Sequence, residues 1–201
     1  MPEGLLKVLI KLFQKFGPRQ GRRRHTNRYV ETIIEVKPLP VNSPCRISPV
    51  QAGDEPHLIS LYLSAFKDTI EYCDWKLEKI ETSAGSNIKD FFIGRWGRPL
   101  PASRAAVCWK PDSGEEQIVG AALISEKKDG QPVLDMLFVE PSWQRKGVAS
   151  SLVSAAINEL FRGGYKSLKS SYHPGNEASS TWHQIILKKF LLTNRDKNTI
   201  L

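Results

Sequence analysis

Residues 132–161 constrain the fold most, because an apolar strand, a polar turn and a periodic helix follow one another there without interruption. Residues 132–139 read Pro-Val-Leu-Asp-Met-Leu-Phe-Val, a run typical of a buried strand. Residues 147–161 place apolar side chains at helical spacing, and Gly163 with Gly164 supplies a stop signal. A further strand at 167–172 should then lie parallel to the first, through a right-handed crossover.

The rest of the pattern predicts a mixed fold. The expected strands span residues 46–50, 105–109, 117–124, 132–139 and 167–172. The expected helices span residues 54–71, 75–93 with an interruption near Gly85, 147–161 and a stretch that opens at Asn176. Short turns join the three middle strands as antiparallel hairpins. We therefore expect an α/β (α+β) fold, in which helices flank a mixed, mostly antiparallel twisted sheet.

The positive charge is concentrated at the N-terminus. The chain of 201 residues has 29 Lys and Arg against 21 Asp and Glu, a net charge of +8. Residues 1–30 hold eight of the basic residues and one acid, so residues 31–201 carry 21 against 20 and are nearly neutral. We therefore divide the chain into a basic arm with a proline-rich linker (1–44) and a globular domain (45–201).

The arm has several interpretations. Residues 4–16 have the spacing of an amphipathic helix with a stripe of lysines. Its apolar side could pack on the domain, residues 4–28 could lie on an anionic membrane surface, or the segment could target an organelle. Nucleic-acid binding is not expected, since the arm lacks interleaved aromatic residues and the domain is nearly neutral.

Cysteine and histidine usage predicts neither a metal site nor a disulfide framework. Cys45, Cys73 and Cys108 are widely spaced, odd in number and outside any CxxC motif. Histidines with HExxH or similar spacing are also missing. A reduced, cytoplasmic location fits this pattern best.

The turn before the predicted 147–161 helix has the composition of a phosphate-binding loop. It reads Gln144-Arg145-Lys146-Gly147-Val148-Ala149. A glycine-containing turn at a helix N-terminus exposes unpaired backbone N–H groups at the positive end of the helix dipole, which suits a pyrophosphate. The loop is neither a Walker motif nor GxGxxG. Alone, it equally fits an ordinary helix start with solvated basic residues.

The context of the loop resembles the GNAT superfamily of N-acetyltransferases. The chain reads Leu137-Phe138-Val139-Glu140-Pro141, followed by Gln144-x-x-Gly147-x-Ala149, and the family pattern is a similar strand end followed by Gln/Arg-x-x-Gly-x-Gly/Ala. The resemblance runs from about Arg46 to His183. It implies transfer of an acetyl group from acetyl-CoA to an amine substrate. The alternative is an acyl-CoA-binding module without turnover.

The resemblance also implies residues that hold the coenzyme. The strand at Leu137, Phe138 and Val139, held open by a bulge, would pair through its backbone with the pantetheine arm. Residues 144–149 with Ser150 would hold the pyrophosphate. The last helix would complete the site through Asn176, Ser179 and Trp182.

Catalytic and acceptor residues follow from the same comparison. His183 stands where relatives often have a tyrosine, so it either protonates the departing thiolate or only lines the pantetheine channel. Asp135, expected on the strand face of Leu137 and Val139, is a candidate base, with a water relay as the alternative. Glu71 and Tyr72 fall where relatives build the acceptor pocket, although a solvated helix end explains them equally well.

The C-terminus departs from the family pattern. Relatives usually continue into two more strands, whereas residues 184–201 are too few for helix completion and a long hairpin. We therefore expect a truncated C-terminal hairpin and an uncovered parallel edge strand, which would favour a homodimer.

Overall fold

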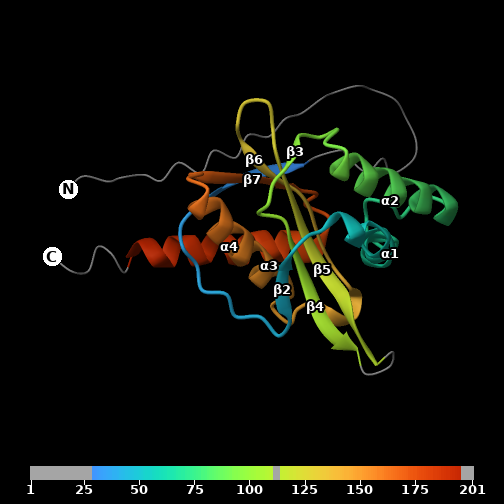
Figure 1. Ribbon diagram of the computed structural model, residues 1–201. Helices are drawn as coiled ribbons and strands as arrows, with labels where there is room; N and C mark the ends of the chain where they lie inside the picture. Colours follow the sequence, from blue (N-terminus) through green and yellow to red (C-terminus); the bar gives the residue numbers. More distant parts are fainter. Residues whose placement is uncertain (1–28, 111–113, 196–201) are drawn as a thin grey trace.

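The computed structural model describes residues 29–110 and 114–195 (Figure 1). The basic arm at 4–28 lies outside the described residues, so its helix and its membrane contact stay predictions. In the described part of the chain, no helix is long and apolar enough to span a membrane. The same residues contain no group of three or more His, Cys, Asp and Glu arranged to hold a metal ion.

The sheet is mixed and mostly antiparallel, which confirms the predicted fold class. Its strands are β1 (Val30–Glu35), β2 (Arg46–Pro49), β3 (Arg98–Pro99), β4 (Arg104–Lys110), β5 (Glu115–Glu126), β6 (Pro132–Val139) and β7 (Ser167–Tyr172). The strand order is β1-β7-β6-β5-β4-β2, and β3 pairs with β5. Only β6 and β7 are parallel among these pairs, as the strand–helix–strand pattern predicts.

Helices cover both faces of the sheet (Figure 1). The helices are α1 (Glu55–Phe66), α2 (Leu77–Phe92), α3 (Val148–Arg162) and α4 (Glu177–Arg195), with short 3-10 turns at Ala52–Asp54 and Pro141–Trp143. One core lies under α3 and α4, and a second lies under α1 and α2. The central strand β5 is buried on both faces, because Ala122 and Ile124 belong to the first core and Ala121 and Leu123 to the second. Its uninterrupted apolar run follows from this position.

Helix α2 runs through Gly85, so the predicted interruption is wrong. A helical glycine costs about 1 kcal/mol relative to alanine. Ala84 and Ile88 on the same helix are fully buried in the second core. This packing outweighs the local propensity that suggested a break.

Strand β1 comes from the segment that the sequence assigned to the linker. It pairs antiparallel with β7 along its whole length, from Val30 opposite Tyr172 to Glu35 opposite Ser167. Thr32 and Ile34 are buried, whereas Ile33 between them is exposed. The predicted uncovered edge at β7 is therefore absent, since β1 occupies it. After β7 the chain continues as α4 to Arg195.

A disulfide joins Cys45 and Cys108, so the prediction of unpaired cysteines is wrong. Strands β2 and β4 pair with Arg46 opposite Val107, which places the two cysteines directly across from each other. Their separation of 63 residues hides this neighbourhood in the sequence.

Candidate functional site

The loop before α3 is built as an open helix N-terminus. Arg145 and Gly147 have φ angles of 58° and 84°, and Gly147 is the N-cap of α3. The first helical hydrogen bond runs from Ser151 N–H to Gly147 C=O, at 3.0 Å. The N–H groups of residues 148–150 precede it, so helix geometry gives them no partner within the helix. A Cβ at Gly147 would meet no atom within 4 Å, which shows that the space in front of the turn is open.

In the loop before α3, the Gln144 side chain is held by a hydrogen bond and the two basic side chains are exposed to solvent. Gln144 Nε2 donates to the carbonyl oxygen of Val139 at 3.0 Å, which ties the loop to the end of β6. Arg145 and Lys146 are exposed, and the Lys146 ammonium lies 4.9 Å from the centre of the Trp143 ring. The structure therefore brings two mobile cations to the positive end of α3.

Strand β6 contains the bulge that the family resemblance implies. Leu123 pairs with Met136 and Ile124 pairs with Leu134, so Asp135 is an extra residue without a partner on β5. The parallel pairing of β6 with β7 ends at Leu134, opposite Ser170. Beyond this point β6 has an unpaired edge, and this edge runs toward the loop before α3.

Backbone alternation tells which groups face the unpaired edge. Glu140 N–H donates to Val119 C=O on β5 at 2.8 Å. Because backbone groups of successive residues in a strand point to opposite sides, those of Leu137 and Val139 face away from β5. The Val139 carbonyl already accepts the bond from Gln144, so the N–H and C=O of Leu137 and the N–H of Val139 remain. These are the groups expected to pair with pantetheine.

Asp135 does not share the side of Leu137 and Val139, so this part of the prediction is wrong. Leu137 and Val139 pack with the first core. The Asp135 carboxylate instead accepts hydrogen bonds from Ser125 Oγ and from Lys127 Nζ, the latter at 2.6 Å. Lys127 also donates to the carbonyl of Trp96, which packs against the second core. The bulge turns Asp135 to this face, where its carboxylate forms a partly buried ion pair with Lys127.

His183 is buried with both ring nitrogens engaged. Nδ1 lies 2.8 Å from the carbonyl oxygen of Ser179 and Nε2 lies 2.9 Å from Ser170 Oγ. Because a carbonyl only accepts, Nδ1 carries the proton and Nε2 accepts from the serine hydroxyl. The ring also stacks on Tyr172. Burial lowers the pKa of His183 to about 4, against the opposing effect of the Ser179 carbonyl.

The stability of the protein should depend on His183 at acidic pH. An unfolded histidine titrates near 6.5, so between pH 6.5 and pH 4 the unfolded chain binds the additional proton. The contribution to the free energy of unfolding is complete above pH 6.5 and falls as the pH drops toward 4, by at most about 3 kcal/mol. Urea unfolding at pH 7.5 and pH 4.5 should show a larger loss for the wild type than for His183→Gln. Equal losses would show that the imidazole titrates normally.

Glu71, one of the two residues predicted for the acceptor pocket, contacts the start of α4. Asn176 Oδ1 accepts from Ser179 N–H at 3.0 Å, which caps the helix, and Asn176 Nδ2 donates to Glu71 Oε1 at 2.9 Å. Tyr72 follows Glu71 and packs edge-on against Trp75. The two loops are 105 residues apart along the chain, and the structure brings them into direct contact.

Two buried polar atoms of the predicted site residues lack a hydrogen-bond partner. Among the buried side-chain nitrogen and oxygen atoms of the described residues, Glu71 Oε2 and Trp182 Nε1 are those without a hydrogen-bond partner. One is an acceptor with negative charge and the other is a donor. Buried polar groups are rarely left unpaired in folded proteins. Both belong to residues that the sequence assigned to the site. A ligand that places a cation near Glu71 Oε2 and a carbonyl oxygen near Trp182 Nε1 would supply the missing partners.

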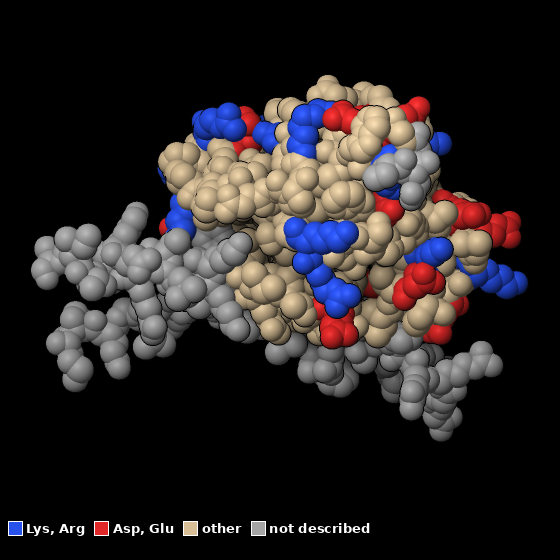
Figure 2. Space-filling model, turned by 90° about the horizontal axis from the view of Figure 1, so that it is seen from below, with Lys and Arg blue, Asp and Glu red and all other residues tan. Residues whose placement is uncertain are grey.

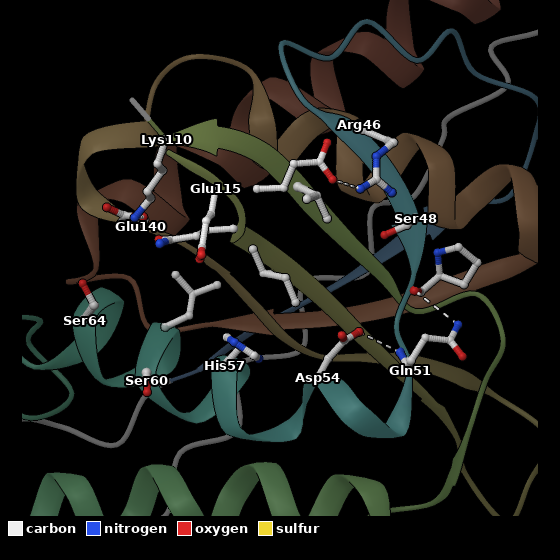
Figure 3. A pocket seen from close by; sticks show the side chains of 16 residues that line it. Arg46, Ser48, Gln51, Asp54, His57, Ser60, Ser64, Lys110, Glu115 and Glu140 are labelled. Carbon is white, nitrogen blue, oxygen red and sulfur yellow. Dashed lines mark hydrogen bonds and ion pairs between the residues drawn. The ribbon is translucent and has the colours of Figure 1, made fainter. Parts of the chain in front are cut away.

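A separate cavity of about 770 Å³ lies between α1 and strands β2, β4 and β5 (Figure 3). Its charges are largely paired with each other: Arg46 with Glu116, and Lys110 with Glu140. No residue that the sequence assigned to the site lines it. The residues that the sequence assigned to the site lie instead at the α3 loop, on β6 and at the Glu71–Asn176 contact.

The surface charge agrees with the near-neutral domain. On the face shown in Figure 2, basic and acidic side chains are interspersed over a mostly uncharged surface. This distribution gives no support to an extended nucleic-acid-binding face there.

The strand pair β6–β7, which separates beyond Leu134, and the open N-terminus of α3 are set in a mixed, mostly antiparallel α/β fold. The family model described as the acetyltransferase (GNAT) family matches residues 72–184, more than half of the chain. The chain therefore belongs to the GNAT acetyltransferase family. No curated protein is similar enough in sequence to match.

Solved structures show the same fold. The PaiA N-acetyltransferase of Thermoplasma acidophilum, in complex with coenzyme A, is 16% identical over 71% of this chain and 87% of that chain, with a TM-score of 0.53. A functionally unknown conserved protein of Staphylococcus epidermidis is 12% identical over 78% of this chain and 55% of that chain, with a TM-score of 0.54. At these identities the likeness extends to the fold.

Proposed function

We propose that this protein is an N-acetyltransferase that moves an acetyl group from acetyl-CoA to a primary amine by direct attack on the thioester. Three features of the described residues carry the proposal. They are the uncapped α3 turn at Gly147, the unpaired β6 edge, and the orphaned polar atoms of Glu71 and Trp182. The complex of the PaiA N-acetyltransferase with coenzyme A supports an acyl-CoA donor.

The donor side uses backbone groups and α4. The N–H groups of residues 148–150 bind the pyrophosphate, with Arg145 and Lys146 adding positive charge. The backbone of Leu137 and the N–H of Val139 pair with the pantetheine amides as an additional strand would. Trp182 Nε1 donates to a pantetheine carbonyl, which satisfies a donor that the protein alone leaves unpaired.

The acceptor side uses Glu71. Asn176 Nδ2 donates to Oε1 of its carboxylate, and Oε2 has no hydrogen-bond partner among the described residues. A primary amine is an ammonium ion near neutral pH, and a charge-assisted hydrogen bond to Oε2 binds it in that form. The amine then loses a proton to water before its nitrogen attacks the thioester carbon. Asp135 takes no part in this scheme, because Lys127 and Ser125 bind its carboxylate.

Thiol release in the presence of an amine panel tests this function. We expect the wild type to release coenzyme A thiol from acetyl-CoA above the rate without amine. Glu71→Gln should raise the KM for the amine about tenfold or more, because it removes the charge that pairs with the ammonium. The stabilisation of the protein by acetyl-CoA should not change in this variant.

Glu81→Gln is the matched control, since Glu81 is an exposed carboxylate on α2. It should leave the KM for the amine unchanged. Background thiol release across the panel, despite measured acetyl-CoA binding, would overturn the transfer reaction and favour a coenzyme-binding module.

A further inference from the structure

The basic N-terminal arm joins the domain at Tyr29, beside the C-terminal end of β7. Strand β1 begins at Val30, which pairs with Tyr172, the last residue of β7. Because this pairing is antiparallel, the residue before β1 lies next to the residue after β7, and the rings of Tyr29 and His173 pack edge-on with centroids 5.8 Å apart. Burial raises the pKa of the Tyr29 hydroxyl, and the charge of Glu71 raises it further, so Tyr29 also lies within electrostatic reach of Glu71.

A short series of contacts connects this junction to Glu71. The carbonyl oxygen of His173 accepts from Asn176 N–H at 2.9 Å, and Asn176 Nδ2 donates to Glu71 Oε1 at 2.9 Å. A Cβ at Gly175 would lie 2.8 Å from Ile70 Cδ1. The turn after β7 therefore packs directly against the loop that carries Glu71, and the arm enters the domain next to this turn.

The unpaired edge of β6 lies at the same end of the sheet. Strand β7 runs parallel to β6, and their pairing ends at Leu134 on β6 and Ser170 on β7. Tyr172 lies beyond this point, where β7 still pairs with β1 but no longer with β6. The junction of the arm, the loop that carries Glu71 and the edge proposed to pair with pantetheine are therefore neighbours at one end of the sheet.

The arm supplies primary amines close to this junction along the chain. Lys15, Lys11 and Lys7 precede Tyr29 by 14, 18 and 22 residues and lie outside the described residues. A flexible chain of 14 residues spans roughly 20 Å on average, and at most about 50 Å when it is fully extended. A lysine on such a tether meets a site near the junction at an effective concentration on the order of millimolar.

We propose that the arm lysines, Lys15 before Lys11 and Lys7, are acetyl acceptors of their own chain, an inference that rests on the proposed acetyl transfer. The Glu71 carboxylate attracts the Lys15 ammonium, which loses one proton to water. Its nitrogen forms a bond to the thioester carbon, the C–S bond breaks, and the electron pair of this bond leaves with sulfur. The second proton of the nitrogen passes through water to the sulfur. The products are an acetylated lysine and coenzyme A thiol.

The lysines of the described domain include a reference for this reaction. Lys166 is exposed and immediately precedes β7, so it lies at the opposite end of the β1–β7 pair from Tyr29. Its carbonyl oxygen accepts from Val36 N–H, just after β1, at 2.9 Å. Acetylation of Lys166 therefore reports the chemical reaction of acetyl-CoA with an exposed lysine away from the junction. Four other described lysines form ion pairs with carboxylates: Lys37, Lys110, Lys127 and Lys169.

Mass spectrometry of the full-length protein, incubated with acetyl-CoA in the absence of any other amine, tests the inference. We expect Lys15 to be acetylated at least about tenfold faster than Lys166, because the tether holds Lys15 near the site. The first-order rate constant for Lys15 should stay the same when the protein is diluted about tenfold, since the reaction occurs within one chain.

Two pairs of variants separate the acceptor from the machinery. Glu71→Gln should slow the acetylation of Lys15 about tenfold and retain the stabilisation by acetyl-CoA, because it removes the charge that attracts the ammonium. Glu81→Gln, at an exposed carboxylate on α2, should change neither quantity. Lys15→Arg keeps the charge of the arm and should shift acetylation to Lys11. Neither Lys15→Arg nor its control Lys166→Arg should alter thiol release with an added amine.

Three results would contradict these proposals in different ways. Equal acetylation of Lys15 and Lys166 would show chemical modification and overturn the inference. A rate constant for Lys15 that rises in proportion to the protein concentration would place the lysine in the site of another copy, and would also overturn it. In both cases, thiol release that depends on an added amine would leave the transferase function standing. A wild type that neither releases thiol with added amines nor acetylates Lys15 would overturn the proposed function itself.

Discussion

Replacing Gly147 with glutamate is expected to abolish the stabilisation of the protein by acetyl-CoA. A Cβ at this position would have no atom within 4 Å, so the fold leaves room for the new side chain beside the α3 turn. Its carboxylate would lie where we place the pyrophosphate and would repel it. The wild type should gain about 2.7 kcal/mol at an acetyl-CoA concentration of 100 times Kd, and the variant should gain almost nothing. Thermal unfolding with and without acetyl-CoA measures both values.

Gly164→Glu separates this effect from backbone strain. Gly164 lies just after the C-terminal end of the same helix, with a φ angle of 81° against 84° at Gly147, and its Cβ position is equally open. Both substitutions place a side chain in a left-handed conformation, at a cost of about 1–2 kcal/mol. Only Gly147→Glu should lose the response to acetyl-CoA. A normal response in Gly147→Glu would remove the α3 turn from the coenzyme site.

Replacing Ile34 with alanine is expected to lower the free energy of unfolding by about 2–5 kcal/mol. Ile34 is 1% exposed and packs in the first core, on a strand that the sequence assigned to the linker. The loss comes from the apolar atoms removed and from the cavity that they leave. Urea unfolding of the wild type and the variant measures the difference.

Ile33→Ala provides the control for Ile34→Ala. Ile33 is the preceding residue of β1 and is 66% exposed, so the same chemical change occurs on the same backbone without a cavity. Its effect should stay within about 0.5 kcal/mol. Equal effects of the two variants would show that β1 does not pack on the domain as the structure has it.

Structural features that depend only on residues close together in the sequence were predictable. The apolar period of residues 147–161 predicted α3, and the β7 strand has the predicted bounds of 167–172. The Gly147 turn was recognisable because its residues are contiguous and need no distant partner. Residues Glu71 and Asn176 were assigned to the site through the family resemblance, whereas their hydrogen bond was not predicted.

Features that depend on register or on distant pairing were missed. The resemblance predicted a bulge in β6, but only the pairing with β5 shows that Asp135 is the extra residue and therefore turns to the opposite face. The Cys45–Cys108 disulfide depends on the register of β2 against β4. The alternation of buried and exposed side chains in residues 30–35 was a usable signal for β1, and the neighbouring prolines obscured it.

The sequence by itself determined the α3 turn and the main strands and helices after residue 46, because helical period, strand alternation and glycine conformation are local properties. The tertiary structure decided which side chains remain available for chemistry. Burial keeps His183 neutral, two hydrogen bonds occupy its ring nitrogens, and Lys127 forms an ion pair with Asp135. Asn176, which lies 105 residues from Glu71 in the sequence, binds one oxygen of its carboxylate, and the other oxygen has no hydrogen-bond partner. The availability of a group depends on neighbours that only the folded chain brings together.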